Sequence, residues 1–407
     1  MDINLCDSFV TGAKLQRLLK KSNIIPSGNE VIDVHSELVG DQGATSKVLR
    51  VYLTWSGPEN GHRLPKSVIV KAIGSDSLIN GYFDSSAQDE LDTFKRQLLM
   101  VHDIECCVYT LQELCRVLPM PICYGATKLQ DQDGGIIILE DLGTRAAMIP
   151  KPTMFSASFN WNQLENLLEA VTDLHAWSVN TDVDWKNQIP SLTENPIMGT
   201  FAEKLLLSLP HTKQEYPDMF TGVDEKKLQE YLTVENYLKI CGCNPRERYG
   251  LPLVLVHGDL QVMNLLFEKV DGNGGQSIIG DRIIGVLDWQ CSHPGCGAED
   301  LARILSWCVP MEIRRQRGEE IMNKYVQLFN SKVVNPSNII NHKNFKRATD
   351  EMFAYSGLTV GCGIVGMVAW AKSLTGVTKE EREIMRLDMI ERTKGHFLDS
   401  LKILGWN

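Results

Sequence analysis

The stretch His257-Gly258-Asp259-Leu260-Gln261-Val262-Met263-Asn264 is the most informative part of this chain. Its spacing is H-x-D-L-x-x-x-N, which sets a histidine, an aspartate and an asparagine at fixed separations. Apolar runs at 253–256 and 265–267 flank it, as expected for two strands joined by a loop. A lone H-x-D would mean little, whereas the ordered set in this setting is a specific signal.

A second carboxylate follows on the next apolar segment, since residues 283–287 indicate a strand that ends at Asp288. Phosphoryl transfer from ATP needs one aspartate that orients the attacking hydroxyl and takes its proton. It also needs an asparagine and a second aspartate that hold Mg²⁺ on the phosphates. We therefore predict Asp259 as the base and Asn264 and Asp288 as Mg²⁺ ligands. The ordinary alternatives are turn chemistry for Asp259 and local hydrogen bonding for the other two.

Three more residues have supporting places in this interpretation. His257 belongs to the catalytic loop, where we expect it to orient the loop rather than to perform chemistry. Asp300 stands at the start of a predicted helix, and it either supports the loop or caps its own helix; both alternatives stay open. His175 lies on the apolar face of another predicted helix and is expected to be a core histidine with satisfied hydrogen bonds.

The first part of the chain offers a candidate phosphate lysine. Lys71 ends the apolar strand Ser67–Ala72, the pattern in which a kinase lysine neutralises the α- and β-phosphates. A strand lysine is more often simply solvated, so a partner acid on the next helix would strengthen the assignment. Glu105 is the preferred partner, with Glu90 and Glu113 as competitors.

Two other segments are candidates for nucleotide contacts. The loop at 40–46 contains Gly40 and Gly43, whose backbone N–H groups could cover the phosphates, although an ordinary hairpin turn is the alternative. Glu140-Asp141-Leu142 follows a strand where the pattern of the chain changes, and backbone groups there would meet the adenine edge.

The order of predicted elements indicates an α+β protein with a small β-rich lobe, residues 1–142, before a large helical lobe, residues 143–407. The expected strands are 30–39, 47–55, 67–72, 136–139, 265–269 and 278–287, and the expected helices include 11–21, 87–117, 223–240, 298–308, 311–330 and 345–373.

Bulk composition excludes several classes of protein. A net charge of -10 argues against nucleic acid as a partner, because phosphate backbones select basic surfaces. The 11 cysteines have no metal-type spacing, so reduced thiols in a cytoplasmic protein are expected. The start of the chain does not resemble a signal peptide, and the apolar run 357–371 is too short for a comfortable membrane span.

These motifs resemble the ecdysteroid-kinase-like family, also called the CHK-kinase-like family. The resemblance rests on His257-Gly258-Asp259-Leu260 with Asn264, on Leu287-Asp288-Trp289-Gln290, and on Asp300-Leu301-Ala302-Arg303. The family belongs with choline kinases and aminoglycoside phosphotransferases in the protein-kinase-like superfamily. The resemblance implies a bilobal kinase fold and ATP-dependent, Mg²⁺-dependent phosphorylation of a small-molecule alcohol. Gln261 departs from the family, because many relatives have an aromatic residue there.

Several functions remain in competition. A small-molecule kinase is favoured over a pseudokinase because the base, both metal ligands and the lysine are retained. A protein kinase is disfavoured, since no D-F-G or A-P-E follows and only about ten residues separate Asp288 from the next predicted helix. The acceptor is expected to be a largely apolar alcohol, such as a steroid or xenobiotic conjugate, with choline-like and aminoglycoside-like alcohols as alternatives. The oligomeric state is left open.

Overall fold

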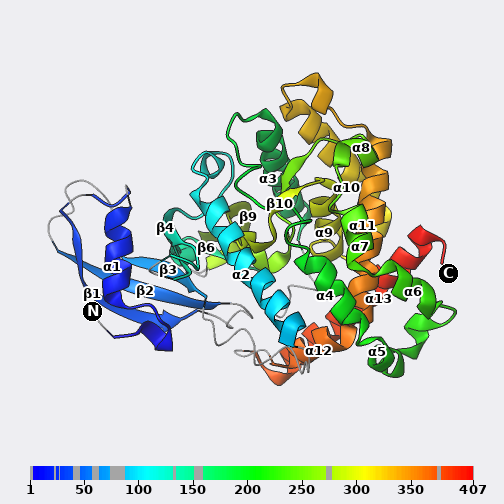
Figure 1. Ribbon diagram of the computed structural model, residues 1–407, viewed down its shortest axis with the longest axis horizontal. Helices are drawn as coiled ribbons and strands as arrows, with labels where there is room; N and C mark the ends of the chain where they lie inside the picture. Colours follow the sequence, from blue (N-terminus) through cyan, green and yellow to red (C-terminus); the bar gives the residue numbers. More distant parts are fainter. Residues whose placement is uncertain are drawn as a thin grey trace. The chain divides into compact units, whose positions relative to one another are not determined.

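The structure is a computed structural model of the chain (Figure 1). It describes residues 3–22, 24–26, 28–39, 46–56, 64–73, 88–131, 134–150, 159–271, 277–373 and 377–406, without the side chains of 88–95, 98, 277 and 370–373. The chain forms two compact units. The first comprises Met1–Arg116 and Met120–Arg145, and the second comprises Val117–Pro119 and Ala146–Asn407.

The first unit is built on an antiparallel sheet with strand order β1-β2-β3-β5-β4. Val68 of β3 pairs with both Val51 of β2 and Glu140 of β5, which places β3 at the centre of the sheet. The elements of this unit are α1 (Gly12–Lys21), β1 (Glu30–Leu38), β2 (Lys47–Ser56), β3 (Ser67–Ala72), α2 (Gln88–Thr110), β4 (Cys123–Thr127) and β5 (Ile136–Glu140).

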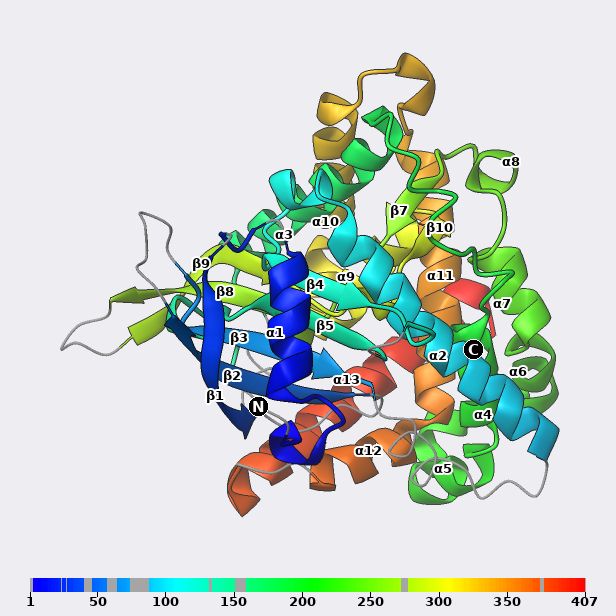
Figure 2. The same ribbon diagram turned by 60° about the vertical axis from the view of Figure 1, so that its left-hand side comes forward.

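The two faces of this sheet have different partners. Val68, Val70 and Ala72 of β3 share a core with Leu15 and Leu18 of α1, which lies across the sheet in Figure 2. Side chains alternate along a strand, so Lys71 points to the opposite face. The alternation of β3 therefore separates the core contacts of α1 from the contacts that Lys71 makes.

The second unit is mainly helical, with two small sheets. Its strand order is β6-β8-β9 in one sheet, while β7 pairs with β10 in the other. Its elements are β6 (Ala146–Ala147), α3 (Trp161–Asn180), α4 (Ile197–Leu206), α5 (Leu209–Glu215), α6 (Glu225–Tyr231), α7 (Val234–Ile240), α8 (Pro245–Tyr249), β7 (Val254–Val256), β8 (Leu265–Asp271), β9 (Ser277–Val286), β10 (His293–Gly295), α9 (Ala298–Trp307), α10 (Met311–Lys332), α11 (His342–Cys362), α12 (Ile364–Ser373) and α13 (Lys379–Leu404).

Two segments of this unit that were predicted to be mostly helical each contain two helices separated by a break. The segment 223–240 is interrupted at Thr233, whose side chain accepts a hydrogen bond from the N–H of Asn236 and so starts α7 as a new helix. The segment 345–373 is interrupted at Gly363, which ends α11, and that helix already begins at His342. The prediction that both segments are mostly helical is confirmed, and the two breaks were not predicted, because apolar periodicity continues across a cap.

The predicted α+β class is confirmed, with an antiparallel sheet in the first unit and helices dominating the second. The remaining predicted strands and helices lie within a few residues of their observed bounds, apart from 87–117, where α2 ends at Thr110. In the described part of the chain, none of the helices has the length and apolar character that a membrane span requires.

Helices α11 and α13 pack closely because glycines remove side chains from their interface. A Cβ at Gly361 would lie 2.2 Å from Cδ2 of Phe397, and one at Gly357 would lie 2.1 Å from Oγ of Ser400. Phe397 is fully buried, so its ring has little room to move. The two glycines thus set how near α11 comes to α13.

We expect Gly361→Ala to destabilise the protein by about 1–3 kcal/mol, since the added methyl overpacks a closed interface. Gly366→Ala on α12 is the matched control, because no atom lies within 4 Å of the Cβ it would add. Alanine there removes the helix penalty of glycine and should stabilise by about 0.5–1 kcal/mol. Urea midpoints measure both effects; a Gly361→Ala protein as stable as the wild type would contradict the close packing.

Candidate active site

The H-x-D-L-x-x-x-N stretch forms a tight loop after β7. Gly258 has φ +81°, a left-handed conformation that favours glycine. A Cβ at this position would also lie 2.4 Å from the carbonyl oxygen of Cys291. The turn that points Asp259 away from the strand therefore requires glycine at position 258.

The loop is anchored by the carboxylate of Asp300 in the first turn of α9. Its Oδ2 accepts a hydrogen bond from the backbone N–H of His257 at 2.9 Å, and its Oδ1 accepts one from the N–H of Gly258 at 2.9 Å. Of the two alternatives for Asp300, loop support is the one present, since its carboxylate binds the loop and no side-chain cap is formed at the start of α9.

His175 of α3 holds this anchor from the other side. Its Nε2 lies 3.0 Å from Oδ2 of Asp300, and neither side chain is exposed to solvent. An ionised carboxylate only accepts hydrogen bonds, so Nε2 carries the proton and Nδ1 accepts from the hydroxyl of Tyr325 on α10. His175 is thus the buried, satisfied histidine that was predicted, and it also positions Asp300.

Burial alone would raise the pKa of Asp300. The hydrogen bonds from His175 and from the backbone N–H of His257 outweigh burial and lower that pKa below its ordinary value. The carboxylate is therefore kept ionised, and in that form it can accept all three N–H groups.

His257 ties the loop to the strand that precedes Asp288. Its Nδ1 accepts the backbone N–H of Asp259 at 3.2 Å, so Nε2 carries the proton and donates to the carbonyl oxygen of Leu287 at 3.0 Å. The ring also packs against the buried indole of Trp289, with 4.5 Å between ring centroids. These contacts are structural, in keeping with the orienting role expected for this residue.

Asn264 holds the carboxylate of Asp259. The amide nitrogen of Asn264 donates to the backbone oxygen of Asp259 at 2.8 Å and to its Oδ2 at 3.1 Å. Because the nitrogen has both hydrogens committed, the amide oxygen of Asn264 is left as an acceptor. The backbone oxygen of Asn264 accepts the N–H of Leu287 at 2.8 Å, which brings the loop beside the segment that ends at Asp288.

Asp288 adopts a left-handed backbone conformation, with φ 64° and ψ 63°. Non-glycine residues rarely occupy this region, and such strain concentrates at functional sites. The strain is maintained by the hydrogen bonds on both sides of Leu287, directly before it. Oδ2 of Asp288 also accepts a hydrogen bond from the side chain of Gln290 at 3.3 Å.

The chemistry of these donors fits Mg²⁺. The amide oxygen of Asn264 and the carboxylate of Asp288 are hard oxygen ligands. Among the residues that the structure describes, no group of three or more His, Cys, Asp or Glu side chains could hold a metal ion by itself. Mg²⁺ on a nucleotide needs no such cage, because phosphates and water complete its coordination.

The environment of Asp259 favours the protonated carboxyl more than water does. Burial raises the pKa of Asp259, and the charge of Asp288 raises it further, while Arg303, His257 and the hydrogen bond from Gln261 oppose this. The raised pKa moves the carboxyl toward the range of a group that exchanges protons during a reaction.

In the first unit, Lys71 and Glu105 form an ion pair. Nζ of Lys71 lies 2.6 Å from Oε2 of Glu105 on α2, and the two side chains are 13% and 2% exposed. The competitor Glu113 is exposed and lies beyond the end of α2. The side chain of Glu90 lies outside the described residues, so the observed pair is the one the sequence favoured.

The side chains after β5 have protein partners. The carboxylate of Asp141 accepts hydrogen bonds from Nε of Arg50 at 2.7 Å and from the hydroxyl of Ser67 at 2.7 Å. Glu140 pairs with Arg145 at 2.9 Å, and Leu142 is buried. The contact of the backbone at 140–142 with the adenine edge stays a prediction. The predicted phosphate-covering residues Gly40 and Gly43 lie outside the described residues.

Two residues beside Asp259 had no predicted role in the site. The side-chain amide of Gln261 donates to Oδ2 of Asp259 at 2.9 Å. Nε of Arg303 lies 3.8 Å from Oδ1 of the same carboxylate. Arg303 could have been found, because it lies three residues after Asp300 and therefore on the same face of α9.

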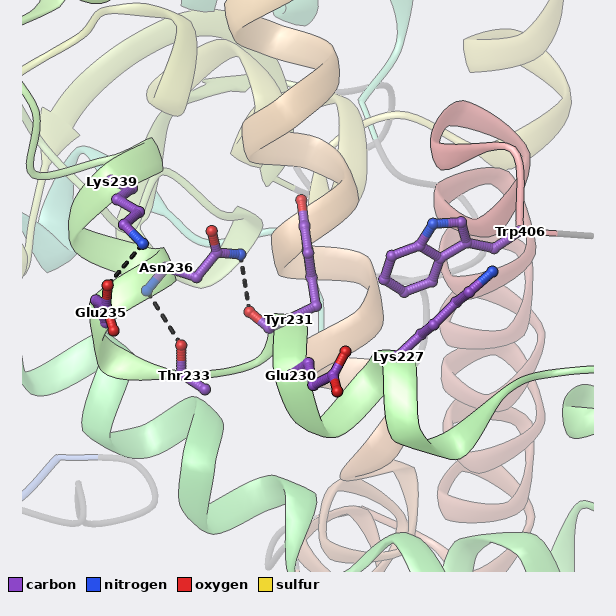
Figure 3. A pocket seen from close by; sticks show the side chains of 8 residues that line it. All are labelled: Lys227, Glu230, Tyr231, Thr233, Glu235, Asn236, Lys239 and Trp406. Atoms are coloured by element: carbon purple, nitrogen blue, oxygen red, sulfur yellow. Dashed lines mark hydrogen bonds and ion pairs between the residues drawn. The ribbon is translucent and has the colours of Figure 1, made fainter.

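A separate pocket of about 350 Å³ lies on the second unit (Figure 3). The rings of Tyr231 and Trp406 line it and meet edge to face at 5.2 Å between centroids. The other lining residues are polar or charged: Lys227, Glu230, Thr233, Glu235, Asn236 and Lys239. None of the predicted site residues lines this pocket. It therefore has no part in the arrangement around Asp259.

These features define a protein-kinase-like fold. A lysine on the third strand pairs with a glutamate on the following helix, and a catalytic-type loop precedes a hairpin that ends at an aspartate. The chain belongs to the DUF1679 family, described as "Uncharacterized oxidoreductase dhs-27", which matches residues 32–404.

Two proteins from Caenorhabditis elegans are similar to this chain in sequence. The chain is 22% identical over 333 residues to "Uncharacterized oxidoreductase dhs-27", covering 80% of this chain and 38% of that protein. It is 23% identical over 216 residues to "Uncharacterized kinase-like protein D1044.1", covering 52% of each. The chain thus spans between about two fifths and about half the length of the curated relatives it matches.

Solved structures with similar backbones include two kinds of phosphotransferase. The GDP complex of aminoglycoside 2'-phosphotransferase-IIIa is 15% identical, with a TM-score of 0.44, and the match covers 89% of this chain and 93% of that one. Choline kinase LicA from Streptococcus pneumoniae is 12% identical, with a TM-score of 0.40, and the match covers 89% and 94%.

One relative carries the name oxidoreductase, and a dinucleotide-binding enzyme would contain a glycine-rich motif. Residues 361–366 have the spacing G-x-G-x-x-G. That motif binds a dinucleotide only between a strand and a helix. Here it joins α11 to α12, and Gly361 and Gly363 lie against the side chains of Phe397 and Leu205, so these two glycines serve helix packing.

We expect Asp300→Asn to destabilise the protein at neutral pH by about 1–3 kcal/mol or more, because buried N–H groups lose an acceptor. The pKa of Asp300 is lowered on folding, so its contribution is fully present above its ordinary pKa of 3.8 and is lost as pH falls below that value. Urea unfolding at pH 7 and below pH 4 measures the difference in the free energy of unfolding between wild type and variant. This difference should be smaller in acid. The exposed Asp182→Asn is the control; an unchanged difference would argue against an ionised anchor.

Proposed function

We propose that this chain transfers the γ-phosphoryl group of ATP to a hydroxyl of a small-molecule alcohol. The observation that carries the proposal is the joining of the segments around Asp259, Asn264 and Asp288 by hydrogen bonds. Positioning and charge stabilisation supply most of the catalysis in phosphoryl transfer. A loop that holds a carboxylate with a raised pKa beside two hard oxygen ligands suits that task.

In this proposal each residue has one task. Asp259 orients the acceptor hydroxyl and takes its proton, and Asn264 and Asp288 would hold Mg²⁺, which screens the phosphate charge when it is bound. Lys71, fixed by Glu105, would bind the α- and β-phosphates. His257 keeps the loop in place through Leu287.

A small acceptor is supported by the segment after Asp288. The chain forms a short turn at Trp289–Cys291, pairs β10 with β7, and begins α9 at Ala298. The pairing of His293 with Val256 leaves this segment no length for a protein-substrate platform. We propose a largely apolar alcohol, such as a steroid or xenobiotic conjugate, as acceptor; choline-like and aminoglycoside-like alcohols are the alternatives.

The test is an ADP-release assay with ATP and Mg²⁺ against sterols, glycosides, choline-like alcohols and aminoglycosides, with product mass measured. Acceptor-dependent ADP release and a phosphorylated product would establish the kinase. Nucleotide binding without turnover on any class would instead favour a pseudokinase, and efficient phosphorylation of choline with none of sterols would overturn the apolar acceptor.

Asp259→Asn should lower turnover by roughly 10²–10⁴, the usual share of general acid–base catalysis. Asparagine keeps the size of the side chain, so nucleotide affinity and thermal stability should change little. Asp182→Asn, an exposed change in the same unit, is the control. Near-normal turnover of the Asp259 variant would remove this residue from the mechanism.

Lys71→Met should weaken nucleotide binding and activity strongly, because it removes the cation proposed for the phosphates. Glu105→Gln should have a similar but smaller effect, since Lys71 keeps its charge but loses its partner. Lys20→Met is the matched control, because Lys20 forms an exposed ion pair with Glu30 at 2.7 Å in the same unit. Equal effects of the Lys71 and Lys20 variants would refute the assigned role.

A further inference from the structure

The two oxygens of the Asp259 carboxylate have different surroundings. Oδ2 accepts hydrogen bonds from the amides of Gln261 at 2.9 Å and Asn264 at 3.1 Å. Within the part of the chain that the structure describes, Oδ1 receives no hydrogen bond, and it forms an ion pair with Nε of Arg303 at 3.8 Å. Oδ1 is therefore the oxygen with a lone pair available for the proton of an acceptor hydroxyl.

Arg303 is placed next to Oδ1 by the same helix that anchors the loop. Asp300 and Arg303 are three residues apart on α9, so both project from one face of that helix. Asp300 binds the loop backbone, while Arg303 faces the carboxylate of the base. The position of the guanidinium relative to Asp259 thus follows from a rigid element and its anchor.

The N–H donors of the Arg303 guanidinium are available to a ligand. At 3.8 Å, its Nε is too far from Oδ1 for a hydrogen bond. The side chain is 16% exposed, and among the described residues its guanidinium donates no side-chain hydrogen bond to a protein acceptor. An arginine presents five N–H groups in a fixed fork that matches phosphate oxygens.

We propose that Arg303 is a further catalytic residue, which binds an oxygen of the γ-phosphoryl group next to Asp259. This inference rests on the proposed kinase function. The acceptor oxygen forms its bond to the γ-phosphorus, and the bond from phosphorus to the β–γ bridging oxygen breaks, leaving its electron pair on ADP. The proton of the acceptor hydroxyl passes to Oδ1 of Asp259. Arg303 stabilises the negative charge on the phosphoryl oxygens.

A purely structural role for Arg303 would be to offset the charge of Asp259. The two roles differ in what they predict for nucleotides. Without that offset the charge of Asp259 would repel a γ-phosphate, so a purely structural role acts only while Asp259 is ionised. A contact with the γ-phosphoryl group persists when Asp259→Asn removes that charge. Gln261 and Asn264 already hold Oδ2, so the carboxylate keeps its orientation without Arg303.

The experiment is calorimetric titration of the full chain with AMP-PNP and with ADP, each with Mg²⁺. Arg303→Gln should weaken AMP-PNP binding about tenfold, equivalent to about 1.4 kcal/mol, while ADP affinity stays within about twofold. Arg303→Lys should retain part of the preference for AMP-PNP, since it keeps the charge but not the fork. Arg282→Gln is the matched control, because Arg282 is a largely exposed arginine of the same unit that pairs with Glu268.

Each outcome decides the matter. An AMP-PNP affinity that falls alone, with Asp259 and in the Asp259→Asn background alike, supports the contact. Equal losses for both nucleotides, no loss, or a loss that disappears in the Asp259→Asn background overturn it while leaving the kinase assignment intact. If the wild type binds neither nucleotide, the proposed function itself fails. Arg303→Met carries the test should the glutamine variant not fold, as judged by its thermal unfolding.

Discussion

A single buried carboxylate organises the second unit. Asp300 has no exposed surface, and it accepts N–H groups from His175, His257 and Gly258. Burying an ionised group is very costly unless hydrogen bonds replace its water. The cost of removing the Asp300 carboxylate from water is compensated only when the loop occupies one position. Its burial therefore disfavours every other arrangement of the loop. The geometry of Asp259 is therefore linked to the packing of α3, α9 and α10.

The first unit solves a similar problem with ion pairs. The buried carboxylate of Glu105 fixes Lys71, and that of Asp141 joins Arg50 of β2 to Ser67 at the start of β3. A long lysine side chain has many rotamers, and ordering it costs conformational entropy. Because Glu105 orders Lys71 beforehand, that cost does not fall on a ligand that Lys71 binds.

What could be predicted from sequence was local. The strand before Lys71, the loop spacing from His257 to Asn264 and the hairpin before Asp288 follow from short-range patterns. Glu105 could be named from the sequence as the preferred partner among three glutamates, and the fold shows that it pairs with Lys71. The role of Asp300 could not be predicted, because a helix cap and a loop anchor look alike in sequence. They differ only once the fold brings Asp300 to His257 and Gly258, which precede it by 43 and 42 positions.

Other features were hidden for related reasons. The breaks in the helices at Thr233 and Gly363 interrupt segments whose apolar periodicity continues, and only the cap geometry reveals them. Gln261 was visible as a departure from relatives, but its hydrogen bond to Asp259 depends on how the loop turns. Side-chain roles that depend on tertiary contacts are not encoded in spacing alone.

The left-handed backbone at Asp288 limits how this position can change over evolution. Glycine, asparagine and aspartate are the residues that adopt such a conformation with least strain. Of these three, aspartate is the one that carries a charge, so no substitution keeps both the backbone and the carboxylate. Glutamate, the usual conservative replacement, would keep the charge but meet the steric cost of φ 64°. A homologue that has lost aspartate here can be sorted by sequence alone: glycine or asparagine marks a retained turn without its charge, and any other residue marks a rebuilt turn.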